Sequence, residues 1–151
     1  MNKNEGFTLV EVSVATVVLA VGLLGLAALQ ASNLKNNQSA YFRSQATQLA
    51  YDIADRMRAN AGAAGNYLSA SMKASEATQQ ADCSKTDGCE PEKMAENDLY
   101  EWQTALAGNL PLGTGEISLA GDIVTVTVGW DDNHDGEVDA KDPNFQMSFQ
   151  L

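Results

Sequence analysis

Histidine is nearly absent from this chain of 151 residues, in which His134 is the single example. That residue lies within an acidic run, and no serine or cysteine nucleophile has an evident partner base in the sequence. A phosphate-binding glycine loop is also lacking, because Gly22 and Gly25 are embedded in an apolar run. These absences leave an enzyme as the weakest of the candidate functions.

Basic residues are scarce as well. The chain has 9 lysines and arginines against 20 aspartates and glutamates, which gives a formal net charge of -11. A nucleic-acid surface needs clustered basic side chains that contact phosphates, so we expect no nucleic-acid partner. The length leaves room for one domain beyond the apolar N-terminal segment.

A long apolar run occupies residues 7–29, and Glu11 is its single ionisable residue. The run is about 23 residues long, which is enough for a helix to cross the ~30 Å hydrocarbon layer of a membrane. A secretory signal peptide would place its small-residue cleavage site after the apolar core, whereas Gly6 precedes the core here. We therefore predict a membrane anchor that would become the new N-terminus if the chain were cut after Gly6.

The residues around this point resemble a known processing site. Residues 6–12, with the sequence GFTLVEV, are similar to the cleavage site of type IV pilins and of the pseudopilins of type II secretion. The resemblance implies that residues 1–6 are a leader peptide and that a prepilin peptidase cuts between Gly6 and Phe7. It also implies methylation of the new amino group of Phe7.

Glu11 needs a partner under this prediction, because a carboxylate within a membrane helix costs roughly 2.5 to 3.5 kcal/mol on insertion scales. The dipole of its own helix would return less than about 1 kcal/mol. The cation that the resemblance implies is the mature amino group of Phe7, in the same chain or in a neighbour. In pilins the corresponding glutamate is understood to guide the docking of one subunit against another, and we expect the same role for Glu11.

The helix is expected to continue through residues 30–60. This second half is amphipathic, with apolar or semi-polar residues at three- and four-residue spacing and no interrupting proline. Arg56 and Arg58 suit a helix C-terminus, and the glycine-containing residues 60–66 supply the stop. The predicted inward face comprises Leu34, Gln38, Phe42, Ala46, Leu49, Ile53 and Met57.

Residues 67–90 lack a sustained period, and we interpret them as an exposed connection with at most one short helix. They contain the two cysteines of the chain, Cys83 and Cys89. In an oxidising periplasm this pair would form a disulfide, which adds roughly 2 kcal/mol for so small a loop. A metal or redox pair is less favoured, because the C-x-x-C spacing and further ligands are lacking.

The remaining residues predict a second helix followed by strands. Pro91 suits a first helical position, the helix ends near residues 108–111, and Trp102 is expected in the core. From residue 117 apolar and polar residues alternate, which indicates three or four antiparallel strands with one apolar face. That face would cover the amphipathic half of the long helix.

The predicted fold class is therefore α+β, with a long N-terminal helix packed on a small antiparallel β-sheet. The predicted parts are a leader at 1–6, a transmembrane or filament-core half-helix at 7–29, an amphipathic half-helix at 30–60 and a globular periplasmic domain at 61–151. We expect a single pass through the inner membrane.

One predicted loop has the spacing of a cation site. Oxygen-bearing residues fall at its positions one, three, five, seven, nine and twelve, and Gly136 is sixth, as in an EF-hand calcium loop. The twelfth residue is aspartate rather than glutamate, and a strand rather than a helix precedes the loop. A weak structural calcium site and a plain acidic hairpin loop both stay open. The ligands would be Asp131, Asn133, Asp135, Glu137, Asp139 and Asp142.

Further segments resemble PilV-type minor pilins of type IV pili, namely residues 23–30, 36–41, 43–47, 55–60 and 98–102. This resemblance implies a pilin fold and a scarce subunit that joins other minor pilins, starts filament assembly and remains near the tip. The major pilin, the prepilin peptidase and the inner-membrane assembly platform are its other implied partners. Two alternatives stay open, a minor pseudopilin of a type II secretion system and a tip-located module that binds an adhesin or a surface.

Overall fold

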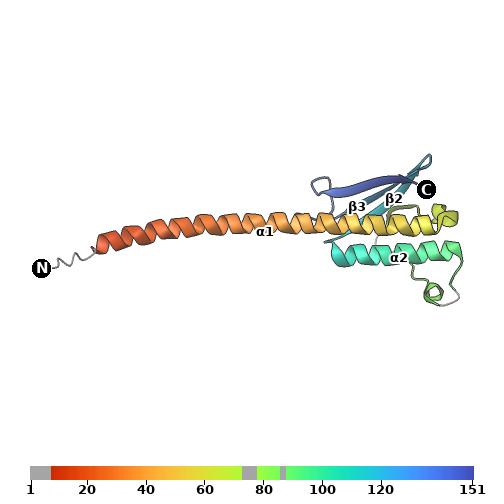
Figure 1. Ribbon diagram of the computed structural model, residues 1–151, viewed down its shortest axis with the longest axis horizontal. Helices are drawn as coiled ribbons and strands as arrows, with labels where there is room; N and C mark the ends of the chain where they lie inside the picture. The colour runs from red at the N-terminus through yellow and green to blue at the C-terminus, as the bar shows by residue number, and fades with distance from the viewer. Residues whose placement is uncertain (1–7, 73–77, 86–87) are drawn as a thin grey trace. The chain divides into compact units, whose positions relative to one another are not determined.

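The computed structural model describes residues 8–72, 78–85 and 88–151. The chain divides into two units, residues 1–39 and residues 40–151. Helix α1 (Leu9–Ala59) contributes its first part to the first unit and its last part to the second (Figure 1).

The first unit consists, in its described part, of the N-terminal part of α1. Large apolar side chains are exposed all round this helix, for example Val10 at 70 % and Leu24 at 72 %. The hydroxyl groups of Ser13 and Thr16 are satisfied within the helix, because each donates a hydrogen bond to the backbone carbonyl four residues earlier, at 2.8 and 2.7 Å. Its most apolar window has a mean hydropathy of 2.5, so α1 is long and apolar enough to cross a membrane.

The second unit packs the last part of α1 and helix α2 (Pro91–Asn109) side by side on one face of a sheet (Figure 1). The buried face of α1 lacks the first two residues of the predicted face. Leu34 is 70 % exposed and Gln38 is also exposed, because both belong to the first unit and burial begins at Phe42. The buried residues of α1 are Phe42, Ala46, Ala50, Ile53, Ala54 and Met57, and Leu49 is partly buried against them.

The sheet is a four-stranded antiparallel meander in the order β1-β2-β3-β4. Its strands are β1 (Ser69–Met72), β2 (Thr114–Ala120), β3 (Ile123–Gly129) and β4 (Asn144–Gln150). The β2–β3 and β3–β4 pairs are in continuous register, whereas the register of β1 on β2 shifts. Alternation correctly predicted β2, β3 and β4, and their antiparallel α+β arrangement with the long helix is confirmed.

The interpretation of residues 67–90 as an exposed connection is wrong at its beginning. The 3-10 helix η1 (Ala61–Tyr67) ends in Tyr67, which is completely buried, and β1 follows directly. The sequence SASM of β1 alternates polar and apolar residues over only four positions and has no β-branched or aromatic residue, which is too weak a pattern to indicate a strand. Another 3-10 helix, η2 (Ala81–Ser84), is the short helix of the connection, while residues 73–77 and 86–87 lie outside the described residues.

Helix α2 begins at Pro91 as predicted and carries the central aromatic residue of the core. Trp102 is completely buried, and its indole Nε1 donates to the carbonyl of Leu49 at 2.9 Å, which joins α2 to α1. On the other side, Gly115 of β2 lies directly on the indole ring. A Cβ at that position would overlap the ring and would come within 2.7 Å of Leu106 Cδ1. The strand can approach the helix this closely because residue 115 has no side chain.

Candidate functional site

The first candidate site is the start of α1. Glu11 is exposed in the first turn of the helix, between Val10 and Val12, which are 70 % and 56 % exposed. Its backbone N–H donates to the hydroxyl of Thr8 at 3.3 Å, which satisfies one of the free amides of the helix start. The carboxylate is thus presented from an apolar surface. The other two predicted residues, Gly6 and Phe7, lie outside the described residues.

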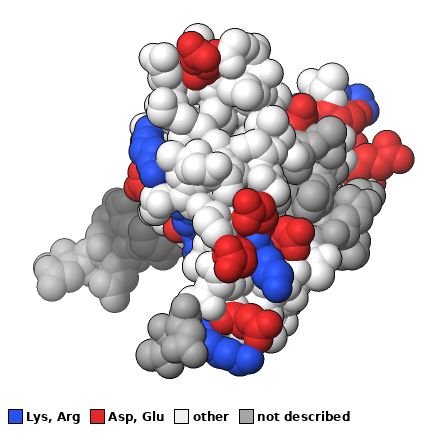
Figure 2. All heavy atoms as spheres, turned by 90° about the vertical axis from the view of Figure 1, so that its right-hand side faces the viewer, with Lys and Arg blue, Asp and Glu red and all other residues white. Residues whose placement is uncertain are grey.

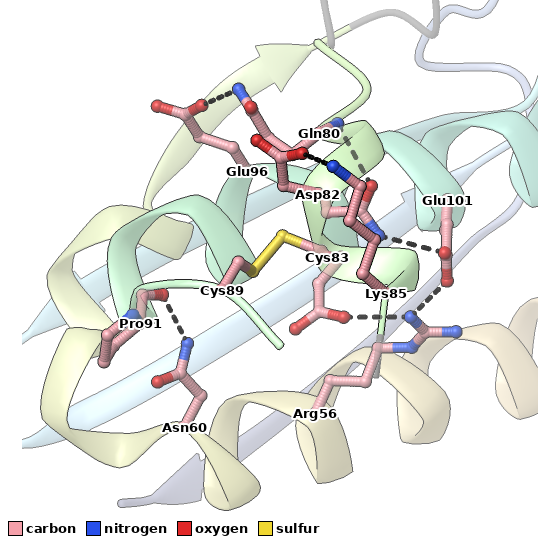
Figure 3. Close-up of a disulfide and its surroundings, with 12 residues drawn as sticks. Arg56, Asn60, Gln80, Asp82, Cys83, Lys85, Cys89, Pro91, Glu96 and Glu101 are labelled. Atoms are coloured by element: carbon pink, nitrogen blue, oxygen red, sulfur yellow. Dashed lines mark hydrogen bonds and ion pairs between the residues drawn. A yellow bond between two sulfur atoms is a disulfide. The ribbon is translucent and has the colours of Figure 1, made fainter. Parts of the chain in front are cut away.

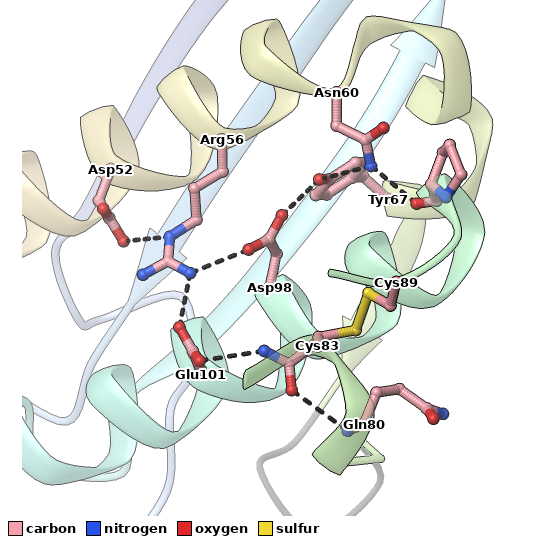
Figure 4. Close-up of polar contacts among 11 residues, drawn as sticks. Asp52, Arg56, Asn60, Tyr67, Gln80, Cys83, Cys89, Asp98 and Glu101 are labelled. Atoms are coloured by element: carbon pink, nitrogen blue, oxygen red, sulfur yellow. Dashed lines mark hydrogen bonds and ion pairs between the residues drawn. A yellow bond between two sulfur atoms is a disulfide. The ribbon is translucent and has the colours of Figure 1, made fainter. Parts of the chain in front are cut away.

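The end of α1 carries a charged network that sequence reasoning missed (Figure 4). Arg56 Nη1 donates to Asp98 Oδ1 at 2.9 Å and to Glu101 Oε2 at 2.7 Å, and its Nε donates to Asp52 Oδ2 at 3.1 Å. One guanidinium therefore holds three carboxylates from two helices. The four-residue spacing of Asp52 and Arg56 is a signal that could have predicted their pair, but no local pattern indicates partners on α2.

The same network reaches the turn after α1 through Asp98, which is only 7 % exposed. Its second carboxylate oxygen accepts a hydrogen bond from the hydroxyl of Tyr67. Asn60 donates to that hydroxyl at 3.2 Å and to the carbonyl of Pro91 at 2.8 Å. Figure 4 shows these groups pointing toward one another from α1, η1 and α2. The network therefore fixes where α2 begins relative to the end of α1.

The charges in this network shift the pKa values of its members. Burial lowers the pKa of Arg56, but the hydrogen bonds to Glu101 and Asp98 outweigh it and the pKa rises overall. Burial and the hydrogen bond to Asp98 raise the pKa of Tyr67. The hydrogen bond from Arg56 lowers the pKa of Glu101. At neutral pH the network therefore contains an arginine cation, a neutral tyrosine and an ionised Glu101.

The two cysteines form the predicted disulfide (Figure 3). It joins Cys83 of η2 to Cys89, two residues before α2. Gln80 attaches the same segment to α2, because its backbone N–H donates to Asn97 Oδ1 at 3.2 Å and its side chain donates to Glu96 Oε2 at 2.6 Å. The disulfide therefore secures the described part of the connection to the start of α2.

The acidic loop joins β3 to β4, as predicted, and two buried carboxylates organise it. Asp131, 4 % exposed, accepts from the backbone amides of Asp135 and Gly136 at 3.2 and 3.0 Å. Asp142, 8 % exposed, accepts from the amides of Asp132 and Asp139, both at 3.1 Å. Backbone N–H groups thus solvate the carboxylates at both ends of the loop. Gly136 has φ +92, so this position needs glycine for the turn.

The other predicted calcium ligands do not converge on one point. Asn133, Asp135 and Glu137 are exposed, and Asp139 forms an ion pair with Lys141 at 3.0 Å. Within residues 8–72, 78–85 and 88–151, no group of three or more His, Cys, Asp or Glu is placed so that it could hold a metal ion. In this conformation the loop is closed by its own hydrogen bonds, and calcium binding stays a prediction.

Acidic side chains are not gathered into one patch on the face of the molecule seen in Figure 2. Aspartates and glutamates are scattered over that face, with lysines and arginines among them. The face carries no continuous basic surface of the kind that phosphate recognition requires.

Two family models match the sequence. The model described as a prokaryotic N-terminal methylation motif matches residues 1–27, and the model described as type IV pilin Tt1218 matches residues 28–100. The matches are adjacent and together run from residue 1 to residue 100. The chain belongs to the type IV pilin family. Comparisons with curated proteins and with solved structures returned no match.

The family matches include the first candidate site at the start of α1. The methylation motif coincides with the start of α1, and the same helix is long and apolar enough to cross a membrane. Both features fit a membrane-anchored pilin, whose family consists of structural subunits that assemble with other pilus components. In this pilin the exposed carboxylate of Glu11 lies within the matched motif.

Proposed function

We propose that this pilin is a minor subunit of a type IV pilus and that it enters the filament through the start of α1. The observation that carries the proposal is the exposed Glu11 carboxylate at the start of α1, where the run of residues 7–29 has no other ionisable side chain. A charge in such surroundings is costly unless a cation meets it. The mature amino group of Phe7, in a neighbouring subunit, is the cation that fits.

The parts of the chain then act in sequence. Prepilin peptidase removes residues 1–6 and methylates Phe7, and residues 7–29 hold the subunit in the inner membrane. Residues 30–60 and 61–151 lie in the periplasm until the assembly platform transfers the subunit into the filament. There residues 7–29 join the apolar core of the filament, and the globular domain contacts its neighbours. The subunit has a structural rather than a catalytic task.

The minor role rests on the PilV-type segments, of which residues 98–102 also supply Asp98 and Glu101 to the network around Arg56. The partners are accordingly other minor pilins and the major pilin, in a complex that primes assembly and remains near the tip. A tip adhesin is a further partner consistent with that position.

A clean deletion of the gene tests this assignment. Surface pili are measured by shearing and microscopy, and export of type II secretion substrates is measured in the same strain. Loss of pili with intact export is the expected result, and expression of the gene in trans should restore the pili. Intact pili with failed export would contradict the proposal and identify a minor pseudopilin instead. The Glu11 mechanism would then apply to the secretion filament.

A further inference from the structure

The two edges of the sheet in the second unit are protected to different degrees. Natural proteins shield edge strands with short length, irregular pairing, proline or charge, because an exposed edge recruits further strands. Strand β1 meets this expectation, with four residues and a shifted register on β2. Strand β4 does not, since its seven residues NFQMSFQ pair regularly with β3 and include neither proline nor a charged side chain.

The outer edge of β4 has free hydrogen-bonding groups. In an antiparallel pair the N–H and C=O groups of alternate residues point away from the partner strand. Among the residues that the structure describes, β4 pairs with β3 alone, and no other backbone or side-chain group bonds to its main chain. These outward groups match the main chain of an extended segment better than they match a helix or a small molecule.

The apolar side chains of β4 are also incompletely covered. On β3, Val124, Val126 and Val128 are buried to 1 % exposure or less, yet their register partners on β4 are only partly buried. A strand added beyond β4, with apolar residues at alternate positions, would complete their burial as β4 does for β3. The partly buried residues are Phe145, Met147 and Phe149.

Charge indicates which kind of chain could occupy this edge. The strand itself is uncharged, but the chain has a net charge of -11, so two copies would repel each other. At the Asn144 end the strand follows the acidic loop, where Glu137 is exposed and Asp139 is partly exposed. An occupant with an uncharged strand flanked by a lysine or arginine at that end would be complementary to both features.

We propose that the open edge of β4 is a docking site for an extended, uncharged segment of a different pilus subunit, which adds a strand to the sheet. This inference deepens the proposed function by assigning a contact surface to the globular domain. It is independent of Glu11, so the two can fail separately.

The first test uses the full-length chain in detergent micelles and a defined probe. The probe is a seven-residue peptide of alternating valine and serine between terminal lysines, which is not a sequence of this chain, and the readout is hydrogen exchange of the amides in residues 144–150. At a peptide concentration ten times its dissociation constant, exchange of alternate β4 amides should slow about tenfold. Unchanged exchange at the highest soluble peptide concentration would overturn the proposal.

Two variants block the edge without adding bulk to the core. The backbone N–H groups of adjacent residues alternate, one pointing toward β3 and the next toward the open side. Proline lacks this N–H group, so one of the two variants, Gln146→Pro or Met147→Pro, removes an outward donor while all hydrogen bonds to β3 are kept. Because Met147 packs on the core and Gln146 does not, each proline variant is compared in thermal unfolding with the alanine variant at the same position, and the smaller additional loss identifies the outward amide. The proline variant at that position should lose the peptide effect and be depleted from sheared pili while remaining in the membrane. Peptide protection equal to that of the unmodified chain would overturn the proposal.

A lysine substitution covers the case in which both proline variants misfold. Ser148→Lys places a charge on the edge strand, whereas Ser118→Lys places the same charge on the same face two strands inward, since Ser118, Thr125 and Ser148 share one row. Only Ser148→Lys should weaken peptide binding and incorporation. Normal incorporation of Ser148→Lys would refute β4 docking and leave the proposed function intact. A further outcome is that, without peptide, hydrogen exchange of the β4 amides slows as the concentration of the chain rises. That result would assign the edge to a second copy of the chain and overturn the proposal.

Discussion

Arg56→Ala is the substitution that tests most directly how the second unit is held together. It leaves the carboxylate of Asp98, 7 % exposed, without its cation, although the hydrogen bond from Tyr67 remains. Removing one partner of a buried ion pair costs about 3 to 5 kcal/mol, while exposed pairs contribute about 1 kcal/mol or less. The Arg56 side chain is 31 % exposed, so we expect a loss of about 2 kcal/mol in the free energy of unfolding.

The assay is denaturant unfolding of the full-length chain in micelles, followed by the fluorescence of the two buried tryptophans, Trp102 and Trp130. Arg43→Ala is the matched control, because Arg43 is exposed on the same helix and forms no ion pair within the described residues. The control should change the free energy of unfolding by less than about 0.5 kcal/mol. Equal effects of the two substitutions would refute the structural role of the network.

Gly115→Ala should lower the free energy of unfolding by about 1 to 3 kcal/mol, because its Cβ would overlap Trp102; denaturant unfolding with no change would contradict this packing. The hydrogen bond from Arg56 lowers the pKa of Glu101 in the folded chain. The interaction therefore stabilises the folded chain fully above the ordinary pKa of 4.5, and this stabilisation is lost as the pH falls through the lower pKa of the folded state. The melting temperatures of Glu101→Gln and the unmodified chain should therefore differ at pH 7 and converge in acid, and a constant difference would refute the linkage. Millimolar calcium, but not magnesium, should raise the melting temperature if the acidic loop binds it, and Asp135→Asn should reduce that rise; equal melting temperatures in calcium and chelator would favour the acidic hairpin interpretation.

The parts of the fold that sequence predicted are those with a local period. Three-residue and four-residue spacing located the buried face of α1 from Phe42 onward, and alternation located β2, β3 and β4. Pro91 marked the first residue of α2. The two cysteines close in sequence correctly indicated the disulfide. Each of these signals requires information from one segment only.

The parts that sequence missed depend on contacts between distant segments. The buried position of Tyr67 follows from Asp98, which lies 31 residues later in the chain. Strand β1 forms because β2 offers it an edge, and its own four residues give only a weak signal, since none is β-branched or aromatic. In the acidic loop, the spacing identified oxygen-bearing side chains but not their orientation, which depends on backbone amides that bind Asp131 and Asp142.

Incorporation of the Glu11→Ala variant into pili is the measurement that tests the central claim, namely that Glu11 brings the subunit into the filament. The variant and a matched control, Ser13→Ala, are expressed in a deletion strain, and each subunit is quantified in membranes and in sheared pili. Ser13 is a suitable control because its hydroxyl bonds to the carbonyl of Leu9 within its own helix, at 2.8 Å. Both variants should insert into the membrane. Loss of an interaction worth 1.4 kcal/mol or more reduces incorporation about tenfold or more, so Glu11→Ala should be depleted from pili by that factor while Ser13→Ala is not. Recovery of Glu11→Ala in sheared pili at the level of Ser13→Ala would contradict the account.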